Sequence, residues 1–249
     1  MKRMIILAVA MVLTVGMAAT QVWAADATAA VDVNSAYVWR GQTFNDGLVL
    51  QPSIDVAAAN GLGINVWGNY DIGNYNHSVD SNAFSEIDLT VSYSKTIGIA
   101  DVGLGVISYQ FPAGATETTE LYVSLGMPIV GGLSGGLNIY YDIEALHAFS
   151  YANLSLTYAY ALNDQLKLEA AGAVGYAGKD FSQAAGGEDG GLYDYSLSVS
   201  LGYTISKAWS ASAKLTYVDA LDDDNLKEVK DGGLMDTHTI FGVSIAYAF

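Results

Sequence analysis

Apolar residues alternate with small or polar residues along most of the chain beyond residue 24. Near the end of the sequence, Phe241, Val243, Ile245, Tyr247 and Phe249 alternate with Gly242, Ser244, Ala246 and Ala248. The same period of two recurs across residues 86–93 and 196–203. Since a period of two places successive side chains on opposite faces of an extended chain, the pattern predicts β-strands with one apolar face.

The alternation predicts about twelve strands, within a range of about 10 to 14. Their expected ranges are 28–40, 48–59, 62–72, 85–97, 101–111, 117–128, 133–144, 150–162, 165–177, 191–205, 208–219 and 237–249. Tight turns, as at residues 60–61, alternate with longer polar loops, as at residues 178–190 and 220–236. This pattern is typical of a transmembrane, antiparallel, up-and-down β-barrel. The expected fold class is therefore all-β.

The composition of the polar face indicates that the apolar face points outward. A soluble β-sandwich packs its apolar face inward and covers the other face with Lys, Glu and Arg. Here the polar face is mainly Ser, Thr, Asn and Gly, and 14% of all residues are charged, against about 25% in soluble domains. Aromatic residues near the strand ends, including Tyr37, Trp39 and Tyr141, fit the girdles at a membrane interface. A secreted soluble β-protein is the alternative.

The first 24 residues have the organisation of a secretory signal peptide. Lys2 and Arg3 precede an apolar run at residues 4–19, and Val22-Trp23-Ala24 fits the positions before a cleavage site. We expect cleavage after residue 24, with residues 25–249 forming a single outer-membrane β-barrel domain of a Gram-negative bacterium. An uncleaved anchor is the alternative, although the run is short for a spanning helix.

Charge and cysteine content exclude several function classes. The chain has 26 Asp and Glu residues against 10 Lys and Arg residues, a formal net charge of −16, and no cysteine. Nucleic acid is not an expected partner, because it attracts basic surfaces. Without thiols the chain has neither a disulfide framework nor a cysteine-ligated centre, and no cofactor is expected.

The charged residues of the polar face are the candidate site residues. The predicted pore-lining set is Asp32, Arg40, Asp55, Asp71, Glu86, Asp88, Glu120, Asp142, Lys167, Glu169 and Lys214, and Asp194 lies on the same face. Rings of carboxylates concentrate cations and repel anions. The sequence therefore predicts a channel that favours cations, and the alternative is that some of these residues are paired and only keep the lumen wet.

Arg40 is the only arginine after residue 24 and is expected to close the polar face of the first strand. A guanidinium can form bidentate bonds with carboxylates and brace the wall. A cation that contacts the solute at a constriction is the rival interpretation.

Other polar residues carry weaker hypotheses. The histidines His77, His147 and His238 and the acidic run at residues 222–225 could contact a metal ion, but their spacing matches no metal motif, so no metal site is predicted. Ser150 follows His147 by three residues, yet no third catalytic group is evident. We therefore expect no enzyme activity.

Several short segments carry a family resemblance. Ala36-Tyr37-Val38-Trp39-Arg40-Gly41-Gln42, Val66-Trp67-Gly68-Asn69, Glu86-Ile87-Asp88-Leu89, Ser108-Tyr109-Gln110-Phe111-Pro112 and Glu120-Leu121-Tyr122 occur in this order. Together they make residues 30–130 similar to the TorF-type porin family of proteobacteria. The resemblance implies an outer-membrane, porin-like protein and names no solute. The terminal Phe249, with Tyr247 and Ile245, resembles the signal that barrel-assembly machinery recognises.

The expected function is passive diffusion of small solutes or ions through an acidic lumen. A non-conducting structural or adhesive barrel is the alternative, with residues 178–190 or 220–236 folded into the lumen as a plug. The expected partners are outer-membrane lipid and lipopolysaccharide, the barrel-assembly machinery and small solutes or cations, and the oligomeric state is open.

Overall fold

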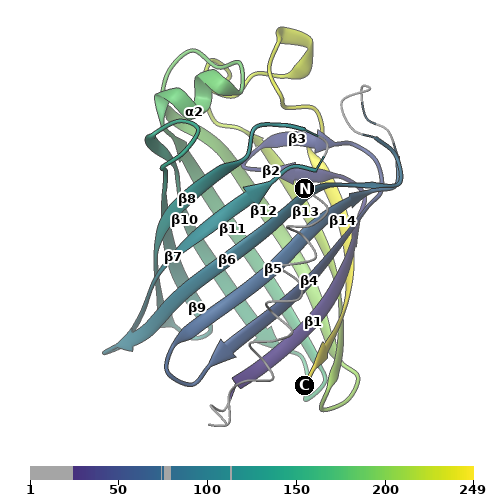
Figure 1. The fold of residues 1–249 in the computed structure, drawn as a ribbon. Coiled ribbons are helices and arrows are strands. Elements are labelled where there is room, and N and C mark those ends of the chain that lie inside the picture. The colour runs from purple at the N-terminus through teal and green to yellow at the C-terminus, as the bar shows by residue number, and fades with distance from the viewer. Residues whose placement is uncertain (1–24, 74, 76–79, 113) are drawn as a thin grey trace, which may run out of the picture.

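The computed structural model describes residues 25–73, 75, 80–112 and 114–249, and in these residues twelve antiparallel strands form a closed barrel (Figure 1). The wall strands are β1 (Ala25–Asn34), β4 (Val49–Ala58), β5 (Leu62–Asp71), β6 (Ala83–Ile97), β7 (Ala100–Gln110), β8 (Thr118–Val130), β9 (Leu133–Asp142), β10 (Ala148–Ala161), β11 (Leu166–Ala177), β12 (Gly191–Thr204), β13 (Trp209–Ala220) and β14 (Thr239–Ala248). Each strand pairs with its neighbours along the chain, and β1 closes the barrel against β14. The prediction of an up-and-down barrel of about twelve strands is confirmed.

The apolar face of the wall points outward. Ile54, Leu104, Leu197 and Phe241 expose 50%, 57%, 57% and 54% of their surface on four different strands. The strand register places such residues side by side. Ile54 of β4, for example, pairs with Val66 of β5. Such a continuous apolar belt is stable in hydrocarbon and not in water, and it leaves the alternate side chains inside the barrel.

Within the described residues, no helix is long and apolar enough to cross a membrane.

The two rims of the barrel differ. We call the rim with tight connections, such as residues 59–61 and 162–165, the turn rim; β1 begins and β14 ends there, where the C-terminus lies at the bottom of Figure 1. The opposite rim, the loop rim, has the longer connections at residues 178–190 and 221–238, as predicted. These loops contain the helix α2 (Lys179–Ala184) and the 3-10 turn η1 (Val229–Asp231), at the top of Figure 1.

The predicted first strand, residues 28–40, is wrong in its second half. The wall strand β1 ends at Asn34, which pairs directly with Val49 of β4. The chain between them leaves the wall and forms a separate hairpin of β2 (Tyr37–Trp39) and β3 (Gln42–Asn45). The apolar alternation continues in phase from β1 into β2, so the pattern does not mark this break. The predicted signal peptide and His77 lie outside the described residues.

Candidate functional site

The β2–β3 hairpin crosses the interior of the barrel. The Tyr37 hydroxyl donates to Glu86 Oε2 of β6 at 2.8 Å, and Gln42 Nε2 donates to the Tyr193 hydroxyl of β12 at 3.2 Å. In the closed order of the wall, β6 and β12 lie half-way round the barrel from each other. A segment bonded to both must therefore span the lumen. Tyr37 and Trp39 belong to this interior hairpin, so their predicted place in an interfacial girdle is wrong, whereas Tyr141 faces outward and is 47% exposed.

The tip of the hairpin is a two-residue turn made by Arg40 and Gly41. Trp39 pairs with Gln42, and the two residues between them have φ values of 49° and 74°. Positive φ at both positions is the pattern of a type I′ turn, which matches the twist of the flanking strands. A Cβ at Gly41 would collide with Leu226 and touch Asp194, which adds to the positive φ in favouring glycine there.

Arg40 forms a buried, bidentate ion pair with Glu120 of β8. Arg40 Nη1 donates to Oε1 at 2.9 Å and Nη2 to Oε2 at 2.7 Å, with side-chain exposures of 6% and 3%. Tyr109 and Ser150 also donate hydroxyl hydrogen bonds to the same carboxylate, at 2.9 and 2.5 Å. A buried carboxylate with several donors compensates a buried guanidinium well. This is the bracing geometry, in which Arg40 ties the hairpin to the wall.

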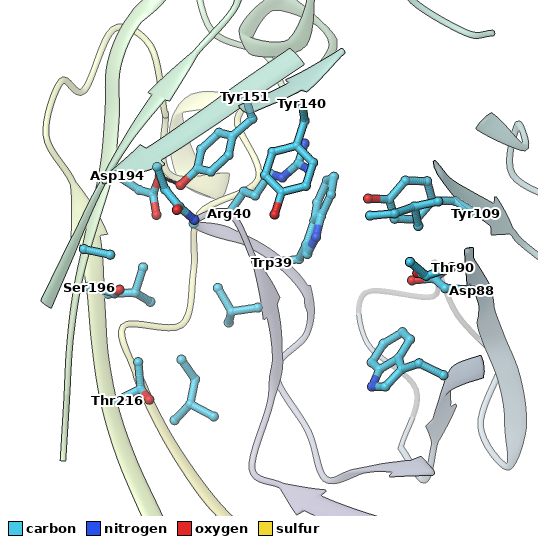
Figure 2. A pocket seen from close by; sticks show the side chains of 18 of the residues that line it. Trp39, Arg40, Asp88, Thr90, Tyr109, Tyr140, Tyr151, Asp194, Ser196 and Thr216 are labelled. Carbon is cyan, nitrogen blue, oxygen red and sulfur yellow. Dashed lines mark hydrogen bonds between the residues drawn. The ribbon is translucent and has the colours of Figure 1, made fainter. Parts of the chain in front are cut away.

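Aromatic rings enclose the same guanidinium. The Arg40 Cζ atom lies 4.1 Å from the ring centroid of Trp39, 4.3 Å from Tyr140, 4.8 Å from Tyr151 and 5.4 Å from Phe181. Figure 2 shows Arg40 among the labelled rings of Trp39, Tyr140 and Tyr151. Faces of aromatic rings attract cations, most strongly where water is excluded. Arg40 is thus held by one carboxylate and by an aromatic cage.

A cavity of about 470 Å³ lies between the hairpin and the wall. Its lining includes the carboxylates of Asp88 and Asp194, the rings of Trp67 and Tyr109, and the hydroxyl groups of Thr90, Ser196 and Thr216, most of which are labelled in Figure 2. Asp194 Oδ1 accepts the Tyr151 hydroxyl at 2.6 Å. Within the described residues, the buried Oδ1 atom of Asp88 has no hydrogen-bond partner. A buried carboxylate oxygen of this kind favours a donor or a cation.

Other predicted site residues near the loop rim are engaged in local structure. Asp71 is fully buried, and its Oδ1 accepts Asn45 Nδ2 of the hairpin at 2.6 Å. Asp142 accepts the backbone amides of Glu144 and Leu146, both at 2.9 Å, and so caps the loop after β9. Asp71 therefore helps to position the hairpin, and Asp142 positions the backbone of the loop after β9.

The remaining predicted residues occupy the middle of the wall and the turn half. Asp55 accepts Asn65 Nδ2 at 2.8 Å, and Asp32 lies opposite a serine and a glutamine of the neighbouring strands. Lys167 Nζ lies 3.0 Å from Glu169 Oε2 in a pair that is 59% and 38% exposed. Lys167 also lines a second cavity, of about 490 Å³, beside the turn rim. Lys214 lies opposite a serine and a glycine on the inward face of β13.

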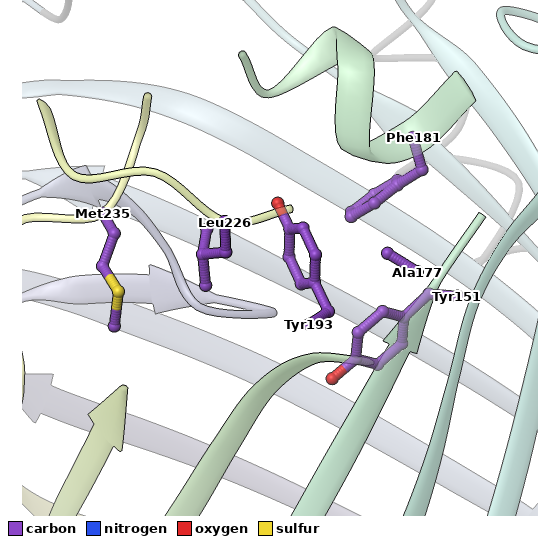
Figure 3. Close-up of a cluster of buried hydrophobic side chains, with 6 residues drawn as sticks. All are labelled: Tyr151, Ala177, Phe181, Tyr193, Leu226 and Met235. Carbon is purple, nitrogen blue, oxygen red and sulfur yellow. The ribbon is translucent and has the colours of Figure 1, made fainter. Parts of the chain in front are cut away.

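Two loops pack on the hairpin from the loop rim. The hydrophobic cluster in Figure 3 comprises Tyr151, Ala177, Phe181, Tyr193, Leu226 and Met235, with Trp39 packed against it. The Thr43 amide donates to the Leu234 carbonyl at 2.7 Å, and the Thr43 hydroxyl accepts the Asp236 and Thr237 amides. The loops predicted as plugs therefore cover the hairpin. The segment that crosses the lumen instead combines the end of the predicted first strand with the predicted loop that follows it.

The loops themselves are tied by polar contacts. Ser182 donates its hydroxyl to the Asn225 carbonyl at 2.8 Å, and Lys227 Nζ lies 2.8 Å from Glu188 Oε1. The backbone amide of Gly190 and the ammonium of Lys179 hold the pKa of Asp189 below its usual range. Asp189 therefore keeps its negative charge in mildly acidic solution.

The described residues offer little of the geometry that a metal site or an activated nucleophile needs. Among the described residues, no group of three or more His, Cys, Asp or Glu side chains is arranged to hold a metal ion. His238 Nδ1 lies 3.4 Å from Asp219 Oδ1 and stacks on Tyr217. Ser150 is fully buried and donates its hydroxyl to Glu120.

Solved structures of two porins and of an outer membrane channel are similar to this barrel. The NanC porin superposes with a TM-score of 0.57 at 14% identity, covering 87% of this chain and 98% of that one. The KdgM porin gives 0.56 at 14% identity, covering 89% and 99%. An outer membrane channel from Pseudomonas putida F1 gives 0.55 at 10% identity, covering 93% and 97%. At such identities the likeness shows the fold, which is that of a porin-like outer-membrane barrel.

The chain belongs to a family described as bacterial protein of unknown function (Gcw_chp), whose model matches residues 18–244. The description does not include the TorF label, so that finer resemblance stays a prediction. No curated protein matches the chain.

Proposed function

We propose that this chain is an outer-membrane channel for passive diffusion of small solutes or ions, with a preference for cations. A closed barrel with an apolar belt and a polar interior supports the channel. The preference rests on the charge balance of that interior.

Unpaired carboxylates on the wall carry this proposal. Among the described strand residues, Glu120 and Glu169 are the carboxylates that form an ion pair with arginine or lysine. Asp55, Glu86 and Asp88 form no such pair with the described residues, although their side chains belong to the inward face. Carboxylates without a basic partner must be hydrated, protonated or bound to cations. The lumen would therefore concentrate cations and repel anions.

The acidic interior also bears on the class of solute. A structure of the KdgM porin is of a complex with disordered oligogalacturonate, which is a polyanion. A polyanion would meet repulsion from the wall carboxylates of this chain. Small cations and uncharged solutes are the solutes that fit better.

A specific observation favours a second candidate function, a non-conducting structural or adhesive barrel. The β2–β3 hairpin spans the lumen and is bonded to opposite walls. If the space around it excludes hydrated ions, the barrel would be plugged.

The test is single-channel recording of the refolded chain in a planar bilayer under a KCl gradient. We expect steady conductance with a reversal potential that favours K⁺. A reversal potential that favours Cl⁻ would contradict the cation preference and would point to Arg40 and the lysines as the controlling charges. No conductance from folded barrels, identified by their heat-modifiable gel mobility, would reject the channel and favour the plugged barrel.

We further infer the route of export and assembly. Cleavage after Ala24 would release the mature chain into the periplasm, before the barrel forms in the membrane. Phe249, 76% exposed, and Ile245, 47% exposed, lie on the outward face beside Tyr247 and would be accessible to barrel-assembly machinery. Outer-membrane lipid and lipopolysaccharide would contact the apolar belt.

A further inference from the structure

We propose that the cavity between the hairpin and the wall binds a small organic cation, with an ammonium group on Asp88 and its hydrocarbon part against Trp67 and Tyr109. This inference deepens the proposed function, on which it rests for the path by which the solute reaches the cavity.

The cavity has the dimensions and lining of a small-molecule site. Its volume of about 470 Å³ falls in the range of ligand pockets, which runs from about 300 to 1,000 Å³. Its wall combines aromatic faces with a few hydroxyl and carboxyl groups. Such a lining is typical of sites that bury an apolar body and orient one polar group.

Asp88 supplies the charge that selects a cation. Its Oδ1 is buried and lacks a hydrogen-bond donor among the described residues. The neighbouring carboxyl of Glu86, two residues along the same face of β6, already accepts the Tyr37 hydroxyl at 2.8 Å. An ammonium group would supply both the missing donor and the missing positive charge.

Arg40 does not remove this attraction, although it lines the same cavity. Its two terminal nitrogens are directed at Glu120, at 2.9 and 2.7 Å, and its charge is compensated there. Asp88 and Asp194 remain as further carboxylates of the lining, and Figure 2 shows them on opposite sides of the hairpin. Among the described residues, neither of these two carboxyl groups has an arginine or lysine partner once the Arg40–Glu120 pair is formed.

The aromatic lining favours an organic cation over a metal ion or a sugar. Metal ions of the Ca²⁺ or Mg²⁺ type need several converging oxygen ligands, and no group of three or more acidic or histidine side chains converges in this way among the described residues. Ring faces instead attract ammonium and guanidinium groups. The barrel already binds one such cation in this manner, because the Arg40 guanidinium lies between a carboxylate and four aromatic rings. A neutral sugar would leave Asp88 without a counter-charge.

The experiment is calorimetric titration of the refolded chain in detergent with three matched probes: 1,5-diaminopentane, 1,5-pentanediol and glutarate. The three probes share a five-carbon chain and differ in charge. We expect the diamine to bind and the diol and the diacid not to bind. Binding of the diol as strongly as the diamine, or no binding of the diamine, would overturn the proposal without any variant.

Asp88→Asn locates the site. This variant should weaken diamine binding by about tenfold or more, the typical contribution of a hydrogen bond to a charged group. Asp223→Asn is the matched control, because it removes the same charge from an exposed position in the loop at residues 221–238, and it should bind like the parent chain. Both variants are compared only as folded, heat-modifiable barrels. Equal affinity of Asp88→Asn and the parent chain would overturn the proposal.

Recordings in bilayers separate this inference from the proposed function. Cation-selective conductance without diamine binding would overturn the site and leave the channel standing. Diamine binding that depends on Asp88 in a silent barrel would support the site and reject the channel.

Discussion

The two halves of the barrel interior each contain an ion pair between a basic side chain and a glutamate. Near the loop rim, Arg40 and Glu120 are 2.7 Å apart and 6% and 3% exposed. Towards the turn rim, Lys167 and Glu169 are 3.0 Å apart and 59% and 38% exposed. The distances are similar, but water surrounds only the second pair. Burial, rather than contact distance, therefore decides how much each pair matters for the structure.

The same contrast extends to the surroundings of the two pairs. In the loop half, the hairpin, α2 and the loop at residues 221–238 pack into a hydrophobic cluster around the guanidinium. In the turn half, Lys167 lines a cavity with small residues such as Ser212 and Ala246. The loop half is built as a packed interior, and the turn half as a polar vestibule.

The largest expected effect on stability comes from breaking the buried pair. Glu120→Gln leaves the buried charge of Arg40 uncompensated and should lower the free energy of unfolding by about 3 kcal/mol or more. Glu169→Gln removes the exposed pair and should cost no more than about 0.5–1 kcal/mol, even before screening by salt. The measurement is urea unfolding of both variants in lipid vesicles. Equal losses of unfolding free energy in the two variants would show that burial does not set the contribution of each pair.

A smaller effect on stability is expected from replacing a glycine in one turn of each half of the barrel. Gly41→Ala places a side chain at a φ of 74° and against Leu226, so both strain and collision oppose it. Gly98→Ala, in a turn at the other rim, has a φ of 65° but no atom within 4 Å of the added Cβ. We expect losses of about 2–3 kcal/mol for Gly41→Ala and about 1 kcal/mol for Gly98→Ala. Limited proteolysis should also cut the hairpin in the first variant only.

The wall was predictable from the sequence because its physics is local. Alternation at residues 86–93, 196–203 and 241–249 identifies strands with an outward apolar face, and hydrocarbon then requires closure. The composition of the polar face decided which side is the lumen. The inward orientation of Asp88 and Asp194 followed from the same period of two.

The hairpin was not predictable, because its sequence obeys the same period. Val31 and Val33 of β1 are in phase with Tyr37 and Trp39 of β2, so nothing in the pattern marks the end of the wall at Asn34. The Arg40–Gly41 turn lacks the asparagine or aspartate that is common in type I′ turns. Its positive φ at Arg40 is stabilised by long-range contacts with Glu120 and the aromatic cage, which a single sequence does not display.

We propose that the hairpin, held by Arg40, restricts the loop half of an acidic channel. Because Asn34 already pairs with Val49, residues 35–48 can be replaced by an Asn-Gly turn that joins β1 directly to β4. The decisive measurement is the single-channel conductance of this variant against the parent chain, in KCl and with folded barrels. We expect a conductance several-fold larger than that of the parent chain, with the preference for K⁺ retained. Equal conductance in the two proteins would show that the hairpin does not restrict the channel.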